Sequence, residues 1–286
     1  MNCFNQNEIK KMIIAALKED IGKRDITTDR LIPEKKKIKA LLLAKEDFIV
    51  SGLEIAALSF KTYDKNIKFK SLVKEGGSIK KGRPLAVITG KARSILIAER
   101  VALNFLSLLS GISTKTKKFV LAVKPYKVKI LDTRKTIPGL RMLEKYAVRM
   151  GGGYNHRSRL DEMVLIKDNH LEIMGNKLRA ADFAELRKEL PRGMKIEVEV
   201  ENLAQFKAAL KLYPDIVMLD NMPSKEMKKA VQIRNNLPGQ LRPIIEASGG
   251  ISLSNVKQAA STGIDLISIG DLTHSFDSVD ISLEIA

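Results

Sequence analysis

From about residue 127 onward, short apolar segments alternate with segments whose apolar residues recur at helical spacing. Repeated strand–helix units of this kind predict a parallel β-sheet with helices packed outside it. About six such units are fewer than the eight of a complete barrel. The sequence therefore predicts an α/β fold with an incomplete or distorted barrel, or an open doubly wound sheet. The expected strands are residues 128–131, 163–166, 196–200, 216–219, 244–247 and 266–269, and the expected helices are 140–150, 180–189, 203–212, 225–235 and 253–261.

The part of the chain before this alternation has a different pattern, typical of an α+β region. Apolar residues in segment 7–20 lie on one face of a helix, which we expect to end at Gly22. A long helix is predicted over residues 92–110, closed by Gly111 and linking the two parts. Between these helices, short extended segments punctuated by glycines are expected at residues 38–43, 48–50, 67–73 and 85–88.

The charge balance indicates an anionic ligand. The 286 residues include 50 Lys and Arg against 33 Asp and Glu, a net charge of +17. Such a field attracts nucleic acid, or a phosphorylated or carboxylated metabolite. The chain has no tryptophan and few other aromatic residues, which does not favour a base-stacking platform. Lysine runs such as residues 35–37 are interpreted as solvated surface.

The compartment is predicted from three features. Unbroken apolar runs such as residues 40–44 are far shorter than the ~20 residues of a membrane-spanning helix. Residues 1–4 lack the basic start and apolar stretch of a secretory signal. The single cysteine, Cys3, cannot form an internal disulfide. We therefore expect a cytoplasmic protein with no membrane partner.

Polar residues or glycines follow every predicted strand of the second part at its carboxyl end. In parallel βα folds the ligand binds at this edge of the sheet. The sequence therefore predicts one shared site, formed by residues 132–136, 167–170, 199, 220–221, 246–250 and 270–271.

Four cationic side chains and a histidine belong to this edge or to the segment after the first strand. Arginine binds carboxylate or phosphate through its planar fork, and lysine acts as a point charge. Several such groups together would hold a multiply charged anion. Structural ion pairs with Asp132 or Asp161 are the alternative for the two arginines. The five residues are Arg134, Lys135, His156, Arg157 and Lys167.

Two carboxylates are expected among these cations. Alternation along segment 196–200 places Glu197 and Glu199 on the same side, with Glu199 nearer the carboxyl end. Together with Asp220, Glu199 would suit sugar hydroxyls or a divalent metal. The sequence contains no zinc-type cluster, so Mg²⁺ held mainly through substrate phosphates and water is the predicted metal. The alternative is that Glu199 only neutralises Lys167.

Glycine-containing loops after the last two strands complete the predicted site. Ser248, Gly249 and Gly250 follow one strand, and Gly270 follows the next. Glycine lets backbone N–H groups approach phosphate oxygens closely. The sequence has no Walker motif, dinucleotide fingerprint or nucleophile elbow, so covalent catalysis by serine or cysteine is not indicated. The site is predicted to hold an anion beside a sugar phosphate.

Longer motifs carry a more specific signal. They are segments 25–28, 99–105, 132–141, 144–149, 151–157, 165–170, 197–200, 246–250 and 272–275. Together they closely resemble the quinolinate phosphoribosyltransferase family, also called nicotinate-nucleotide pyrophosphorylase (carboxylating), over nearly the whole chain. Three departures stand at Ser113, Ile137 and Asp271, where alanine, threonine and a small residue are usual.

The resemblance implies a fold and an assembly. An N-terminal α/β sandwich (residues 1–112), completed by the C-terminal tail (273–286), would pack on an open α/β barrel of the type II phosphoribosyltransferase kind (113–272). It also implies a homodimer, in which the sandwich of one subunit covers the barrel mouth of the other.

The resemblance further implies the reaction. Quinolinate and phosphoribosyl pyrophosphate would give nicotinate mononucleotide, pyrophosphate and CO₂, with Mg²⁺, as a step of NAD biosynthesis. Arg134, His156, Arg157 and Lys167 would line the quinolinate pocket, with Arg100 from the partner subunit. Lys135, Glu199 and Asp220 would contact the phosphoribosyl part and its metal, and Thr133 would also bind substrate. The catalytic residues would be Lys135, Lys167, Glu199 and Asp220. The 5′-phosphate would be held by Ser248, Gly249, Gly250, Ile269, Gly270 and Asp271.

Two alternatives remain at this point. A related pyrophosphorylase would act on a different anionic base. A nucleic-acid-binding protein would explain the charge of +17, and its test is salt-dependent binding to arbitrary DNA.

Overall fold

The computed structural model describes residues 6–175 and 179–286, so Cys3 and segment 1–4, on which part of the compartment prediction rests, lie outside the described residues. The chain divides into two compact units. Unit 1 comprises residues 1–117, 137–152 and 275–286, and unit 2 comprises residues 118–136 and 153–274.

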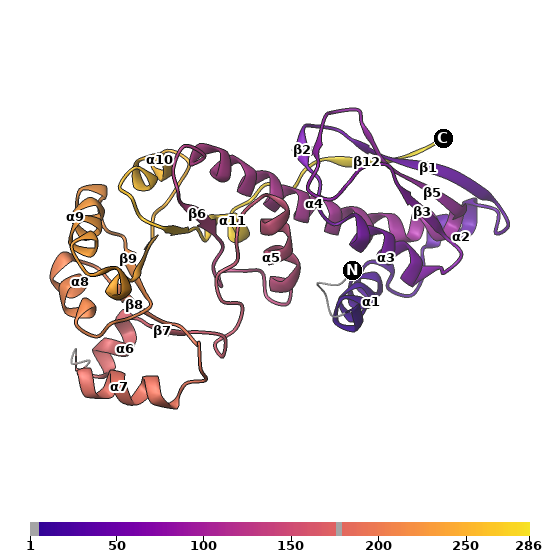
Figure 1. Ribbon diagram of the computed structural model, residues 1–286. Helices are drawn as coiled ribbons and strands as arrows, with labels where there is room; N and C mark the ends of the chain where they lie inside the picture. Colours follow the sequence, from indigo (N-terminus) through magenta and orange to yellow (C-terminus); the bar gives the residue numbers. More distant parts are fainter. Residues whose placement is uncertain (1–5, 176–178) are drawn as a thin grey trace. The chain divides into compact units, whose positions relative to one another are not determined.

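Unit 1 is built on a four-stranded antiparallel sheet (Figure 1). Alternate residues of its second strand, Ala40, Leu42 and Ala44, are buried, which is the pattern of a strand with one face on the core. The strands, in sheet order, are β12 (Ile281–Ile285), β1 (Lys37–Ala44), β5 (Pro84–Lys91) and β3 (Lys68–Ser71), and β2 (Phe48–Ile49) pairs separately with β4 (Ser78–Ile79). The helices of this unit include α1 (Gln6–Ile21), α2 (Ile26–Leu31), α3 (Leu53–Tyr63) and α5 (Arg141–Met150).

The long helix α4 (Ala92–Ala122) continues past Gly111, so the predicted end at that glycine is wrong. Gly111 instead allows a close approach of another segment. A Cβ atom at this position would stand 2.2 Å from the carbonyl oxygen of Asp277. The glycine is therefore required by packing inside unit 1, which sequence spacing alone does not distinguish from a helix stop.

Helix α4 is long and apolar enough to cross a membrane. Polar residues interrupt it, so an unbroken apolar run in the sequence does not reveal this property. However, 67% of its most apolar stretch is buried inside the protein. Ile95, Leu106, Leu109 and Ile112 are fully buried on it. This burial is typical of the core helix of a soluble protein.

Unit 2 contains six parallel strands in one sheet, which confirms the predicted open α/β barrel. Its two edge strands are not paired with each other in the described residues, so the barrel is incomplete. The strands, in sheet order, are β6 (Lys129–Leu131), β11 (Leu266–Ser268), β10 (Ile244–Ser248), β9 (Ile216–Asp220), β8 (Ile196–Val200) and β7 (Val164–Ile166).

Helices follow these strands in the expected alternation, and α8, α9 and α10 lie side by side outside the sheet (Figure 1). Helix α5 is the exception, because it belongs to unit 1 although it lies between β6 and β7 in the chain. The helices of unit 2 are α6 (Asp168–Ile173), α7 (Ala180–Glu189), α8 (Leu203–Leu210), α9 (Ser224–Asn235), α10 (Val256–Ala260) and α11 (Asp271–His274).

Candidate active site

A pocket of about 830 Å³ lies at the carboxyl ends of the six parallel strands. Every strand contributes to it, either through its last residues or through the loop that follows, as the strand-end pattern predicted. The lining residues are Thr133, Arg134, Lys135, His156, Arg157, Leu165, Lys167, Asp168, Glu199, Met218, Asp220, Asn221, Ser248, Gly249, Gly250, Ile251, Ser252, Ser268, Ile269, Gly270, Asp271 and His274.

All of the predicted binding residues except Arg100 line this pocket. Arg100 is exposed on α4, in unit 1. The pocket is formed by unit 2 alone, and Arg100 is not among its lining residues.

Lys167 and Glu199 form an ion pair across two neighbouring strands. The Nζ atom of Lys167 lies 3.3 Å from Oε2 of Glu199. Burial raises the pKa of Glu199, while the charge of Lys167 opposes that rise and Asp220 and Asp168 add to it. The ion pair left open by the sequence is therefore present, and Glu199 also interacts electrostatically with two further carboxylates, Asp220 and Asp168.

Arg157 is held by its surroundings and stands beside a second arginine. Its Nη1 donates to the carbonyl oxygen of Met163 (2.8 Å), and its Nε is buried without a hydrogen-bond partner. Burial and then the charge of Arg134 lower the pKa of Arg157, whereas Glu197 raises it. Two crowded guanidinium groups with an unpaired buried N–H favour binding of an anion.

The carboxylate of Asp220 is fixed by its neighbour. Asn221 donates from Nδ2 to Oδ2 of Asp220 (2.7 Å), and its backbone N–H donates to the carbonyl oxygen of Ser248 (2.9 Å). Gly249 adopts φ +82°, and a Cβ atom there would lie 2.4 Å from Oδ1 of Asn221. The loops after β9 and β10 therefore pack closely only because residue 249 is glycine.

The loops after β6 and β11 are tied together in a similar way. The hydroxyl of Thr273 donates to the carbonyl oxygen of Lys135 (2.7 Å). A Cβ atom at Gly270 would lie 2.9 Å from Nε2 of His274 and 3.1 Å from Cδ of Lys135. Asp271, the unusual residue of this loop, begins α11 and lies 3.6 Å from the ring of His274.

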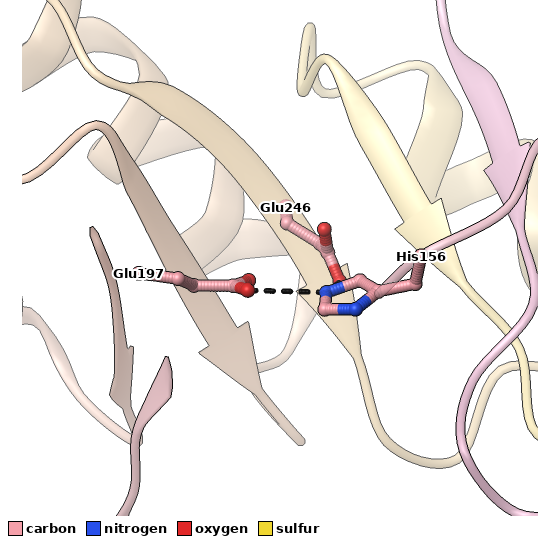
Figure 2. Close-up of side chains that lie close together, drawn as sticks. All are labelled: His156, Glu197 and Glu246. Carbon is pink, nitrogen blue, oxygen red and sulfur yellow. Dashed lines mark hydrogen bonds and ion pairs between the residues drawn. The ribbon is translucent and has the colours of Figure 1, made fainter. Parts of the chain in front are cut away.

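One histidine and two buried glutamates form a cluster (Figure 2), and the histidine of this cluster lines the pocket. The His156 ring points between the carboxylates of Glu197 and Glu246, which come from β8 and β10. Its Nε2 atom is 3.1 Å from Glu197 Oε2 and 3.6 Å from Glu246 Oε1. Burial, reinforced by the charge of Glu197, raises the pKa of Glu246 to about 8. The Ser268 hydroxyl also donates to Glu246.

The sequence did not predict this cluster or several pocket residues. The sequence places Glu246 and Asn221 at strand ends without giving either a role, and it does not assign His274 to the site. Glu246 lies within a mainly apolar strand segment, and a buried charge requires a partner. This position in the sequence was the available signal that Glu246 interacts with another polar group. The approach of Asn221 to Gly249 depends on backbone conformation and had no sequence signal.

An open parallel α/β barrel with a cation-rich pocket and glycine loops at its strand ends defines an enzyme-type site for a phosphorylated, multiply anionic ligand. The comparisons specify the class. Residues 25–110 match the family described as quinolinate phosphoribosyl transferase, N-terminal domain, and residues 112–284 match the C-terminal domain. The chain therefore belongs to the quinolinate phosphoribosyltransferase family.

Individual relatives are similar over their full length. A probable nicotinate-nucleotide pyrophosphorylase [carboxylating] of Methanocaldococcus jannaschii is 43% identical, covering 96% of both chains. The probable enzyme of the same name from Bacillus subtilis is 39% identical, covering 99% of this chain and 95% of the relative. The solved nicotinate-nucleotide pyrophosphorylase of Francisella tularensis has a TM-score of 0.90 at 36% identity, covering 99% and 98%.

Proposed function

We propose that this protein transfers the phosphoribosyl group of phosphoribosyl pyrophosphate to quinolinate, releasing pyrophosphate and CO₂ and forming nicotinate mononucleotide. The observation that carries this conclusion is full-length membership of the family together with the cationic pocket at the strand ends. The product is a pyridine nucleotide, so the enzyme serves NAD biosynthesis.

The quinolinate side of the pocket is assigned to Arg134, Arg157 and Lys167. Quinolinate carries two adjacent carboxylates, and each can accept charge-assisted hydrogen bonds from these side chains. The unpartnered buried Nε of Arg157 supports this assignment, because a ligand carboxylate would supply the missing acceptor. Each such bond contributes roughly 1.5–3 kcal/mol.

The phosphoribosyl side is assigned to the glycine loops and Lys135. Gly249 and Gly250 both have positive φ, at +82° and +60°. Backbone N–H groups exposed in this conformation can approach the 5′-phosphate without a side chain in the way. The loop of Ile269, Gly270 and Asp271 follows the neighbouring strand and lines the same pocket.

The carboxylates of the pocket suit Mg²⁺, which prefers oxygen ligands and retains several of its waters. Asp168, Glu199 and Asp220 all line the pocket, and the electrostatic interaction between Glu199 and the other two supports their proximity. Glu199 and Asp220 would hold the ion through water and substrate oxygens. When bound, Mg²⁺ neutralises charge on the departing pyrophosphate.

The chain's own residues contribute positioning and charge. Arg134 and Arg157 would hold quinolinate so that its ring nitrogen faces the anomeric carbon of the sugar. As that carbon loses pyrophosphate, positive charge develops on the sugar, and the carboxylates of Glu199 and Asp220 stabilise it. The alkylated ring then accepts the electron pair released when the 2-carboxylate leaves as CO₂, and a proton replaces the carboxylate.

We also propose the assembly and location implied by the resemblance. A homodimer would allow Arg100 of the partner subunit to complete the quinolinate pocket, and the exposure of this arginine supports that role. A cytoplasmic location is consistent with the burial of helix α4.

One assay tests the function. Purified protein is incubated with Mg²⁺, phosphoribosyl pyrophosphate and either quinolinate or nicotinate, and nicotinate mononucleotide is quantified by chromatography. We expect product and stoichiometric CO₂ from quinolinate only. Comparable turnover of nicotinate would contradict the dicarboxylate pocket and favour a related pyrophosphorylase.

A further inference from the structure

His156 lines the pocket, but its ring is committed to other protein groups. Its side chain is only 8% exposed. Its Nδ1 accepts a hydrogen bond from the backbone N–H of Arg157 (2.9 Å), and its Nε2 lies 3.1 Å from Glu197 Oε2. Both ring nitrogens are therefore engaged before any substrate arrives.

These contacts determine which nitrogen carries the proton. Because Nδ1 accepts from Arg157, it must present its lone pair. The proton of the neutral ring is then on Nε2, where it is donated to Glu197. The second carboxylate, Glu246, lies 3.6 Å from the same nitrogen and is itself held by the hydroxyl of Ser268. The two buried strands thus fix the tautomer and the orientation of the ring.

The same ring fixes the peptide that carries Arg157. The backbone N–H of His156 donates to Oδ1 of the fully buried Asp132 (2.9 Å), and the following N–H is held by the His156 ring. Further along, the Arg157 guanidinium donates to the carbonyl oxygen of Met163. Arg157 is therefore restrained at its backbone and at its tip, which lowers the entropy lost when it orders around an anion.

A metal ion is the competing explanation for the cluster. One ligand atom from each of His156, Glu197 and Glu246 lies within 4.8 Å of the others, which is compatible with a divalent cation. A metal on Nε2 would require the ring proton to move to Nδ1. That nitrogen faces the N–H of Arg157, so the move would place two donors against each other.

We infer that His156 is a positioning residue: the buried pair Glu197 and Glu246 holds its ring so that Nδ1 anchors the backbone of Arg157, and His156 makes no hydrogen bond to quinolinate. This inference rests on the proposed function, because it assigns Arg157 to quinolinate. It replaces the direct substrate contact that the family resemblance implied for His156.

A double-mutant cycle on quinolinate affinity tests this inference. Isothermal titration with quinolinate is carried out on the full chain and on His156→Ala, Arg157→Ala and the double variant. Residues that act through each other give non-additive effects. We expect His156→Ala to weaken binding by about tenfold alone, but by less than about threefold in the Arg157→Ala background. Equal effects in both backgrounds would overturn the inference.

Lys167→Gln is the matched control background, because Lys167 lines the same pocket and its Nζ pairs with Glu199, which is outside the His156 cluster. In that background His156→Ala should keep its full effect. Loss of the effect there as well would mean general damage to the pocket and would also overturn the inference. Failure of the unmodified protein to bind quinolinate would instead contradict the proposed function.

Nitrogen NMR of the histidine rings gives a readout that leaves His156 and Arg157 unchanged. The chain has only three histidines, so His156 can be assigned by difference with His170→Gln and His274→Gln. We expect the Nε2–H tautomer at neutral pH, unchanged by quinolinate or by chelators. An Nδ1–H tautomer, or ring shifts that follow metal removal, would overturn the inference, whether or not the His156→Ala variant folds.

Discussion

Asn221 holds the carboxylate of Asp220 through a 2.7 Å hydrogen bond while its own backbone adopts a left-handed conformation, with φ of 51°. Asparagine tolerates this conformation better than most residues do. The side chain of Asn221 also occupies the space that a Cβ atom of residue 249 would need. Asn221 therefore sets the geometry of both the Asp220 carboxylate and the loop that contains Gly249.

The first prediction concerns the charge of Asp220. Asp220→Asn keeps the shape of the side chain but removes the negative charge that would favour the cationic sugar. We expect the single-turnover rate to fall by about tenfold or more, with quinolinate affinity nearly unchanged, because only binding that is stronger in the transition state lowers the barrier. Rapid-quench kinetics and titration with quinolinate measure the two quantities.

Arg157→Ala is the comparison for Asp220→Asn. It should weaken quinolinate binding first, because it removes a cation of the dicarboxylate site. If Asp220→Asn abolished quinolinate binding in a correctly folded protein, the assignment of Asp220 to the sugar side would be wrong.

The second prediction concerns Gly249. Gly249→Ala would force a side chain into a left-handed backbone and against Asn221, so we expect a lower Tm and a raised KM for phosphoribosyl pyrophosphate. The backbone strain alone should cost about 1–2 kcal/mol. Gly193→Ala is the control, because Gly193 has φ +87° but open space around its Cβ position. It should lower Tm and leave KM unchanged. An unaltered KM in Gly249→Ala would exclude this loop from substrate binding.

The third prediction concerns Arg100 and the proposed dimer. Arg100→Ala and Lys167→Ala should each be inactive, because one would remove the partner's contribution and the other a residue of the pocket itself. In a mixed dimer one of the two sites would retain both residues, so the activity of the purified hybrid should return to about half of the unmodified level. Differently tagged chains allow the hybrid to be purified before assay. A verified hybrid without activity would rule out a shared site.

The fourth prediction concerns pH. The folded protein raises the pKa of Glu246 to about 8, mainly through burial, from an unfolded value near 4.5. Between these values the folded state binds a proton that the unfolded state has lost, so the free energy of unfolding falls as pH rises, by at most about 1.4 kcal/mol per pH unit from this group. Glu246→Gln mimics the protonated form and should make the protein less sensitive to pH between 5 and 8.

Thermal unfolding at several pH values measures this effect. Glu185→Gln, at an exposed position of α7, is the control and should leave the pH dependence as it is in the unmodified protein. If Glu246→Gln lowered Tm equally at pH 5 and pH 8, titration of Glu246 would not contribute to the pH dependence.

Much of unit 2 could be predicted from the sequence, because parallel strands buried on both faces are continuous apolar runs. The segments expected at 163–166 and 216–219 became β7 and β9 with almost the same bounds. Strand direction then brings the strand ends together, so pocket residues as distant in sequence as Arg134 and Asp220 could be grouped without a structure.

Other features depend on contacts between distant segments and left no periodic signal. Gly111 resembles a helix stop, but its reason is a neighbouring carbonyl oxygen of Asp277. Helix α3 was not predicted, because its residues 55–58 form a short continuous apolar run, which periodicity alone does not assign to a helix or a strand. The partners of His156 could not be predicted either, since β8, β10 and the loop before Arg157 meet only in the folded sheet.

The sheet of unit 1 has a consequence for the order of synthesis. Its strand β12 pairs with β1, yet the two are separated in the chain by the whole of unit 2. A ribosome therefore releases the barrel segment long before the residues that complete the first sheet, and β1 has an open edge throughout that interval. Until residues 281–285 arrive, this edge can pair with another nascent chain, so a delay in translation late in the message would favour aggregation through unit 1.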